Sequence, residues 1–203
     1  KNLNLSAIIF PTLFSENKQT ILAFDNIEIF INSKGAISIR IGDEEISIKK
    51  PLSLRNWYKI NVKISLNGKI KISQKNLKNR KEKEANNEVK MTVNNIYSGK
   101  IYVAASVLKK NINNHFNGKI ESPSIAVDGK KIGHWDLSKN TSSTFVNSIV
   151  GPKLLLKNFP TRAVTSSKWD GSEMNWQNKS EHYAAIHFHE DDIYDFEWET
   201  DFK

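Results

Sequence analysis

The stretch YKINVKISLNGKIKI, residues 58–72, predicts the fold of this protein. From Tyr58 to Leu66 every second residue is apolar, and the residues between them are Lys, Asn or Ser. Successive side chains of a strand point to opposite faces, so this run gives one apolar and one polar face. Asn67-Gly68 follows as a strong hairpin signal, and the alternation resumes at Ile70 and Ile72. The stretch therefore predicts two antiparallel strands with one face buried and a lysine-bearing face in solvent.

The same period of two continues on both sides of this hairpin. Apolar residues alternate with polar ones in Ile27–Ile31 and Ala36–Ile41, and further strands are expected at Lys100–Leu108 and Gly118–Val127. Pro123 lies inside the last run, which predicts a sheet edge or a β-bulge there. No segment keeps a 3.6-residue period over three turns. Many short strands joined by turns predict an all-β fold, an antiparallel β-sandwich or jelly roll.

One segment of this part lacks large apolar residues. Residues 74–90, QKNLKNRKEKEANNEVK, are strongly charged. We expect a long solvated loop without a function of its own, with a single exposed helical turn as the alternative.

Length and cysteine content set further limits. A chain of 203 residues suits one domain and buries enough surface to fold without disulfides; it contains no cysteine. The absence of cysteine fits a reducing compartment, so we expect a cytoplasmic protein. No apolar run approaches the roughly 20 residues that cross a bilayer, so no membrane contact is expected. The chain starts at Lys1 and ends in a strand-like run, so we expect it to be a piece of a longer polypeptide.

The net charge of +8 is unevenly distributed. Residues 1–135 hold 23 Lys/Arg and 11 Asp/Glu (23 − 11 = +12), whereas residues 136–203 hold 7 and 11 (7 − 11 = −4). The positive charge is nearly all lysine, and most of it alternates with apolar residues along strands. Nucleic-acid binding favours arginines and interleaved aromatic residues on one face. The pattern instead indicates a solvated sheet face, and no nucleic-acid partner is expected.

The sequence changes character near residue 130. Alternation weakens, turn-forming residues become frequent, and four of the five tryptophans appear. This predicts a β-sandwich over residues 1–130 and a loop-rich extension over residues 131–203 that packs on the sandwich. Large aromatic side chains in irregular segments usually serve packing. The expected aromatic anchors are Trp135, Trp169, Trp176 and Trp198.

Residues 183–189, YAAIHFH, form the most suggestive candidate site. On a strand, His187 and His189 face the same side, which is a beginning for a metal site, and Asp191 adds a His-x-Asp pair. No spacing brings a third ligand from His115, His134 or His182, so the metal prediction is weak. The alternative is a polar interface in which carboxylates accept hydrogen bonds from amides and imidazoles. The residues concerned are His187, His189, Glu190, Asp191, Asp192, Tyr194 and Asp195. No Gly-x-Ser-x-Gly elbow, phosphate-binding glycine loop or thiol nucleophile is present, so no catalytic residue is assigned.

The first 127 residues resemble a laminin-G-like, concanavalin-type jelly roll. The similar motifs are LSAIIFPT at residues 5–12, KQTIL at 18–22, GAISIRIG at 35–42 and PLSLRNWY at 51–58. The resemblance implies an antiparallel jelly roll with an irregular C-terminal extension.

The last third resembles the large (beta) subunit of N,N-dimethylformamidase and its relatives. The similar motifs are GKIESP at 118–123, WD at 135–136, PTRAVT at 160–165 and WDGS at 169–172, together with the stretch YAAIHFHEDDIYDFEW at 183–198. The resemblance covers essentially the whole chain.

This resemblance implies a parent amidohydrolase that cleaves small N-substituted amides to a carboxylic acid and an amine. In that family the reaction depends on iron held by tyrosines and a glutamate. No position of this chain matches those ligands, so no cofactor is expected in this segment. The implied partners are the catalytic domain of the same polypeptide and a small second subunit in an oligomeric parent. The His-rich strand would then be the bridge to the catalytic part, with His187, His189, Asp191 and Asp192 at the interface.

Three functions remain open from the sequence. The first is a non-catalytic structural module of such an iron amidohydrolase. The second is a carbohydrate-binding or adhesive laminin-G-like module, with sugars stacked on Trp169, Trp176 and Trp198. The third is a jelly-roll metal oxygenase that uses His187, His189 and Asp191.

Overall fold

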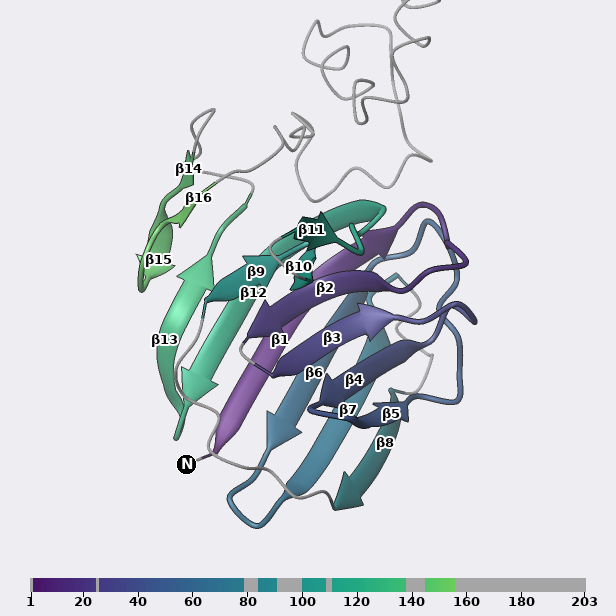
Figure 1. The fold of residues 1–203 in the computed structure, drawn as a ribbon, viewed down its shortest axis with the longest axis horizontal. Coiled ribbons are helices and arrows are strands. Elements are labelled where there is room, and N and C mark those ends of the chain that lie inside the picture. The colour runs from purple at the N-terminus through teal and green to yellow at the C-terminus, as the bar shows by residue number, and fades with distance from the viewer. Residues whose placement is uncertain are drawn as a thin grey trace, which may run out of the picture.

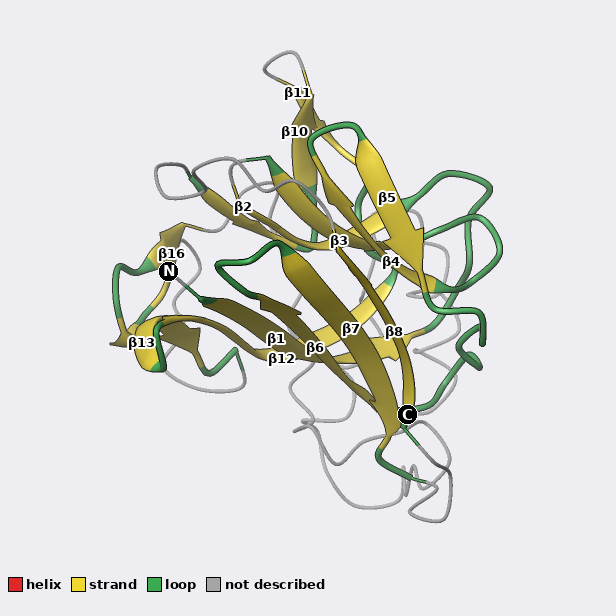
Figure 2. Ribbon diagram, turned by 90° about the horizontal axis from the view of Figure 1, so that it is seen from below, coloured by secondary structure: helices red, strands yellow, loops and turns green. Residues whose placement is uncertain are grey.

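Two antiparallel sheets lie face to face in the computed structural model (Figure 1), and the view from below shows them as two layers (Figure 2). The structure describes residues 2–24, 26–78, 84–90, 100–108, 111–137 and 145–155. The predicted all-β antiparallel sandwich is confirmed. Among the described residues, no helix is long and apolar enough to cross a membrane.

The larger sheet has seven strands. In spatial order they are β15 (Ser148–Val150), β13 (Lys130–Trp135), β12 (Gly118–Val127), β1 (Leu3–Pro11), β6 (Tyr58–Ile64), β7 (Lys69–Asn76) and β8 (Ala85–Lys90).

The smaller sheet has five strands. In spatial order they are β5 (Glu44–Ser47), β4 (Ile37–Ile41), β3 (Ile27–Ile31), β2 (Gln19–Phe24) and β9 (Ile101–Val103). Two short pairs complete the described elements: β10 (Ser106–Leu108) with β11 (Asn111–Asn113), and β14 (Phe145–Val146) with β16 (Leu154–Leu155).

Isoleucine fills the space between the two sheets. The main cluster of buried apolar residues has 23 members, of which 14 are isoleucines. On β3 and β4 the residues at every second position, such as Ile29 and Ile39, are at most 5% exposed. Burying one such side chain stabilises the fold by about 1.5–3 kcal/mol relative to leaving it in water. Their branched side chains also favour extended backbone, so local preference and core packing agree.

The predicted hairpin at residues 58–72 forms between β6 and β7. Ile64 lies opposite Ile70, and Val62 lies opposite Ile72. Gly68 adopts a φ of +76°, which glycine reaches without steric cost. The amide of Gly68 donates to the carbonyl of Ser65 at 2.9 Å, which closes the turn. The buried face of this hairpin is apolar and the outer face carries lysines, as the alternation predicts.

The expected irregularity at Pro123 is a β-bulge inside the sheet. Strand β12 pairs with β1 on one side and with β13 on the other, so it is not an edge strand. Its register with β1 shifts between Ser6 and Ile8, which places two residues of β12, Ser122 and Pro123, opposite Ala7. Ser122 has a φ of +45° at this point. A proline has no amide hydrogen to give to the ladder, and a bulge accommodates that loss.

The prediction of a loop over residues 74–90 is wrong where the structure describes this segment. Strand β7 continues to Asn76, and β8 occupies Ala85–Lys90 at the edge of the sheet. The inward positions of β8 are Ala85, Asn87 and Val89, so its alternation contains little apolar signal. Asn87 Nδ2 donates to the carbonyl of Ser47 at 2.8 Å, and this bond links β8 to the opposite sheet. At this edge a hydrogen bond from a polar side chain therefore helps to hold the two sheets together, as apolar contacts do in the central strands.

One further strand prediction needs adjustment. The expected strand over Lys100–Leu108 is divided into β9 and β10, because Ala104 adopts a φ of +65°. The amide of Ala104 donates to the carbonyl of Ile21, and its carbonyl accepts from the amide of Phe116. Beyond residue 130 the larger sheet continues, since β13 pairs with β12 and β15 pairs with β13.

Candidate functional site

Most of the predicted site lies outside the described residues. This applies to His187, His189, Glu190, Asp191, Asp192, Tyr194 and Asp195, and to the tryptophans Trp169, Trp176 and Trp198. Their proposed roles at an interface, a metal or a sugar therefore stay predictions. Within the described ranges, no group of three or more His, Asp or Glu side chains lies close enough to hold a metal ion.

Trp135 is the one predicted anchor that the structure describes. Its side chain is 0% exposed, and its indole Nε1 donates to the carbonyl of Pro152 at 2.7 Å. The ring packs on Gly133, where a Cβ would come within 2.4 Å of it. A side chain at position 133 would thus displace the indole. Trp135 attaches the segment around Pro152 to the end of β13.

His134 precedes Trp135 on the opposite face of β13. Partial burial lowers the pKa of its imidazole below the usual range, and the neighbouring charge of Lys131 acts in the same direction. The carboxylate of Asp136 opposes this shift without cancelling it. His134 is therefore neutral at pH 7.

The outer face of the five-stranded sheet carries a partly buried ionic cluster. Glu28 on β3 accepts a hydrogen bond from Thr20 Oγ1 at 2.6 Å and pairs with Lys18 Nζ. Arg40 on β4 lies 4.0 Å from Glu28 and pairs with Glu45 at 2.9 Å. The Lys18 ammonium and the Arg40 guanidinium each lie 5.3 Å from the ring centroid of Phe30. These cations cover Phe30, which is only 2% exposed although it points away from the core.

Glu28 remains ionised in this cluster. Burial alone would raise the pKa of its carboxyl, but hydrogen bonds from Lys18 and Thr20 and the charge of Lys18 outweigh that effect. A further hydrogen bond from Ser106 acts in the same direction. The pKa of Glu28 is therefore lowered from its usual value. Because the carboxylate is paired on several sides, we assign the cluster a structural role.

The outer face of the seven-stranded sheet is strongly basic on β6 and β7. Lys59 on β6 lies directly opposite Lys75 on β7, and Lys63 lies directly opposite Lys71. All four side chains are exposed. We call these four residues the lysine quartet. Asn61 and Ser73 lie opposite each other between its two pairs.

An aromatic patch adjoins the quartet on the same face. Phe10 at the end of β1 packs against Trp57, with ring centroids 5.1 Å apart, and Lys119 Nζ lies 5.7 Å from the Phe10 centroid. Trp57 immediately precedes Tyr58, the first residue of β6. Its indole Nε1 is buried and has no hydrogen-bond acceptor among the residues that the structure describes. A buried donor without a partner is costly and requires an explanation.

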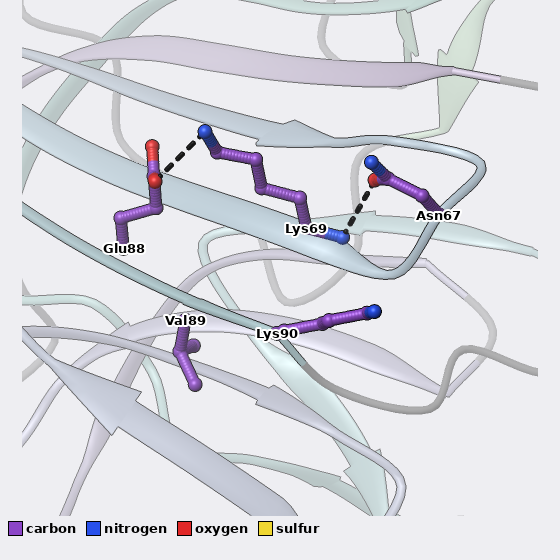
Figure 3. Close-up of a pocket in the computed structure, with 5 residues that line it drawn as sticks. All are labelled: Asn67, Lys69, Glu88, Val89 and Lys90. Carbon is purple, nitrogen blue, oxygen red and sulfur yellow. Dashed lines mark hydrogen bonds and ion pairs between the residues drawn. The ribbon is translucent and has the colours of Figure 1, made fainter.

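A shallow depression opens where β7 begins and β8 ends. It has a volume of about 330 Å³ and is lined by Asn67, Lys69, Glu88, Val89 and Lys90. Figure 3 shows Lys69 reaching toward Glu88 on the neighbouring strand, at 2.8 Å, while Val89 points to the other side. Because its acidic group is already paired and its walls are open, the depression offers no enclosed chemistry.

The sequence analysis predicted neither the ionic cluster around Glu28 nor the aromatic patch of Phe10 and Trp57, here called the Trp57 patch. The first had a readable signal, because Glu28 and Arg40 occupy outward positions of adjacent strands. The second had none, since the contact of Phe10 with Trp57 joins residues 47 positions apart (57 − 10 = 47).

Comparisons with known proteins give a partial match. No protein-family model matches the chain. A stretch of 80 residues is 35% identical to the N,N-dimethylformamidase beta subunit of Alcaligenes sp and covers 36% of this chain. A stretch of 87 residues is 31% identical to the beta subunit of the same enzyme in Paracoccus aminophilus and covers 39% of this chain. These matches span 10% and 11% of the two subunits, so the matched part of the chain corresponds to only about a tenth of their length.

Among solved structures, the fold is similar to a protein of Bacteroides ovatus ATCC 8483 described as a "putative carbohydrate binding protein". The TM-score is 0.59 at 14% sequence identity, over 75% of this chain and 50% of that one. At this identity the likeness concerns the fold alone. The chain is thus a β-sandwich that is distantly homologous, over part of its length, to the beta subunit of N,N-dimethylformamidase.

Proposed function

We propose that this chain is a non-catalytic structural and interaction module of an iron amidohydrolase related to N,N-dimethylformamidase. The observation that carries the proposal is the similarity of 31–35% to two beta subunits of that enzyme. A two-sheet sandwich with a closed isoleucine core suits a scaffold, because its outer faces are free to contact other parts of a larger protein. In finer detail we propose a laminin-G-like arrangement of the strands.

The parent would act on small N-substituted amides and would be a cytoplasmic oligomer. The iron would be held by residues outside this chain, and the partners would be the catalytic domain of the same polypeptide and a small second subunit. The Trp57 patch supports a docking role, because an acceptor on a neighbouring domain would satisfy its buried N–H.

The test starts from the reading frame that encodes these 203 residues. We expect it to encode tyrosines and a glutamate able to hold iron, and the encoded protein to hydrolyse N,N-dimethylformamide. The intact protein should be compared with one that lacks residues 1–155, by size-exclusion chromatography and by release of dimethylamine. We expect the deletion to impair assembly, while the 203-residue chain alone releases no amine. Amide hydrolysis by the 203-residue chain, or full assembly and turnover after the deletion, would refute the proposal.

A carbohydrate-binding module is the second candidate. The similar fold of the Bacteroides ovatus protein favours it, since that protein is described as carbohydrate-binding. The test is a glycan array with the 203-residue chain and with variants in which Trp169, Trp176 or Trp198 is replaced by Ala. Binding of a defined glycan that one of these substitutions abolishes would favour this candidate over the first.

The third candidate, a jelly-roll oxygenase, depends on His187, His189 and Asp191. Metal analysis of the purified chain separates it from the other two. Iron at one equivalent per chain, lost in a variant with His187→Ala and His189→Ala, would support it.

A further inference from the structure

The tetrapeptide Asn-Gly-Lys-Ile occurs twice in this chain, at residues 67–70 and at residues 117–120. The two copies contain the only Asn-Gly dipeptides of the sequence. An asparagine followed by glycine easily loses its side-chain amide, because glycine has no side chain to hinder the approach of its own backbone nitrogen. Since the two tetrapeptides are identical, a large difference in their reactivity in the folded protein must come from the fold.

The reaction proceeds through a five-membered ring. The backbone nitrogen of the glycine attacks Cγ of the asparagine, a new C–N bond forms, and the side-chain nitrogen leaves as ammonia together with the proton of the glycine amide. Water then opens the succinimide at either of its two carbonyls, which gives aspartate or isoaspartate. Ring closure requires the glycine nitrogen to approach Cγ, so a fold that fixes this segment suppresses the reaction.

The copy at Asn117 is fixed by contacts with distant parts of the chain. The amide of Asn117 donates to Oε1 of Gln19 at 2.9 Å, and Gln19 is only 2% exposed. The carbonyl of Asn117 accepts from the amide of Thr12 at 3.1 Å. Gly118 begins β12, and a Cβ on it would come within 2.2 Å of the carbonyl oxygen of Phe10. Gly118 can therefore approach the Asn117 side chain only if the end of the pairing between β1 and β12 opens.

The copy at Asn67 lies in the turn between β6 and β7, where the contacts are mostly local. The amide of Gly68 donates to the carbonyl of Ser65 at 2.9 Å, within the same turn. A longer link joins the amide of Leu66 to Asn2 Oδ1 at 3.2 Å. Asn67 is exposed, and Leu66 is 76% exposed. Exposed turns of this kind open at a small fraction of the free energy that opens a central sheet.

The side chain of Asn67 is also folded back over the following peptide. Its Oδ1 accepts a hydrogen bond from the amide of Lys69 at 3.1 Å, as Figure 3 shows. This Asx turn keeps Cγ near the intervening amide of Gly68. The N–H of Lys69 draws electron density from the carbonyl that is attacked. The turn thus brings together the two groups that react.

We propose that Asn67 is a site of spontaneous deamidation in the folded protein and that Asn117, in an identical tetrapeptide, is protected by the sheet. Water is the co-reactant, and the products are ammonia and a chain that carries aspartate or isoaspartate at position 67. Either product replaces a neutral amide with a carboxylate close to Lys69, and isoaspartate also lengthens the backbone of the turn. This reactivity is independent of the proposed function.

Peptide mapping of the 203-residue chain tests the proposal, because mass spectrometry distinguishes the amide from the acid at each site. One sample is kept folded at mildly alkaline pH, and a second is kept in concentrated urea at the same pH and temperature. In urea we expect the two sites to react at similar rates, since their tetrapeptides are the same. In the folded sample we expect Asn67 to react at least about tenfold faster than Asn117, because only Asn117 requires part of the sheet to open.

Two matched variants check the assignment in the intact molecule. Asn67→Gln removes the reactive site, because glutamine would have to close a larger and less favourable ring. The less positively charged form that accumulates in the wild type should then decrease severalfold in cation-exchange chromatography. Asn117→Gln should leave its accumulation unchanged. Far-UV circular dichroism checks that both variants are folded.

Two results would overturn the proposal. Equal rates at the two sites in the folded chain, or a faster reaction at Asn117, would mean that the sheet gives Asn117 no protection. An unreactive Asn67 over the time in which the urea sample is converted would mean that the hairpin turn protects this site as well. Neither result bears on amide hydrolysis by the parent, so a failure here stays distinct from a failure of the proposed function.

Discussion

At the level of single residues, Glu28 and Trp57 show two opposite ways of burying a polar group. Glu28 is surrounded by donors, so its carboxylate stays charged although its side chain is only 13% exposed. Trp57 has an indole N–H that is buried without an acceptor. The first arrangement stabilises the chain, whereas the second leaves a desolvated donor unpaired among the described residues, which costs stability.

Replacing Glu28 by Gln should destabilise the sandwich by about 1–3 kcal/mol at pH 7, because hydrogen bonds to a charged group are lost. Urea unfolding measures this difference. The control Glu45→Gln removes a more exposed ion-pair partner and should cost less than about 1 kcal/mol. Equal costs for the two variants would mean that burial of the Glu28 cluster has no energetic consequence.

The contribution of Glu28 should also depend on pH. Its pKa in the folded state lies below the usual value of 4.5, so the folded protein favours the ionised form. The stabilisation is therefore complete above pH 4.5 and is lost as the pH falls through the folded-state pKa. The difference in unfolding free energy between wild type and Glu28→Gln should vanish at low pH. A difference that grows on acidification would contradict the assignment.

Comparing Trp57→Phe with Trp135→Phe measures how much an indole N–H contributes to stability when it lacks an acceptor and when it has one. Trp57→Phe removes a donor without an acceptor, so its stability should stay within about 1 kcal/mol of the wild type. Trp135→Phe also removes the bond to Pro152 from a side chain that is 0% exposed, and it should cost about 2–4 kcal/mol. Urea unfolding of the 203-residue chain compares them. If Trp57→Phe is as damaging as Trp135→Phe, Trp57 belongs to the packing of the isolated sandwich.

At the level of elements, turns decide which strands become neighbours. The connection from β12 to β13 is a tight turn in which Asp128 and Gly129 both have positive φ, +47° and +80°. The amide of Asn2 donates to Asp128 Oδ1 at 2.7 Å, so the turn is also tied to the start of β1. This turn attaches β13, and through it Trp135, to the sheet.

Gly129→Ala isolates the backbone contribution of this turn. A Cβ at this position meets nothing within 4 Å, so no clash contributes. The remaining effect is the left-handed conformation, which costs an L residue about 1–2 kcal/mol. Thermal or urea unfolding should show this loss, whereas the neighbouring substitution Lys130→Ala should change stability by less than about 0.5 kcal/mol. An unchanged stability for Gly129→Ala would show that the turn rearranges freely.

At the level of the whole molecule, the proposed function gives the sandwich and residues 181–202 different roles. We expect the variant with His187→Ala and His189→Ala to leave the sandwich folded but to impair assembly of the full-length parent. The reason is that these imidazoles would lie at the junction with the catalytic part and not in the core. Circular dichroism of the 203-residue chain and size-exclusion chromatography of the parent measure the two effects. If the variant unfolds in the isolated chain, the histidines are core residues and the junction must lie elsewhere.

The sequence by itself determined the two-layer architecture. Its period of two assigns each strand an inner and an outer face, as at Ile60 and Lys59, and turn residues such as Gly68 mark where strands reverse. These signals come from residues that are close together in the sequence, so they can be recognised without knowledge of the tertiary structure. They also fixed the lysine-bearing character of the outer face before its geometry was known.

The tertiary structure alone decided which residues meet. Strand β8 turns only two apolar side chains, Ala85 and Val89, toward the core and is also held by Asn87 and its pairing with β7, so its sequence looks like a loop. The opposition of Lys59 to Lys75, the cover over Phe30 and the unpaired N–H of Trp57 all depend on register between distant segments. A register shift of one residue would turn these side chains to the other face, and no local pattern specifies that choice.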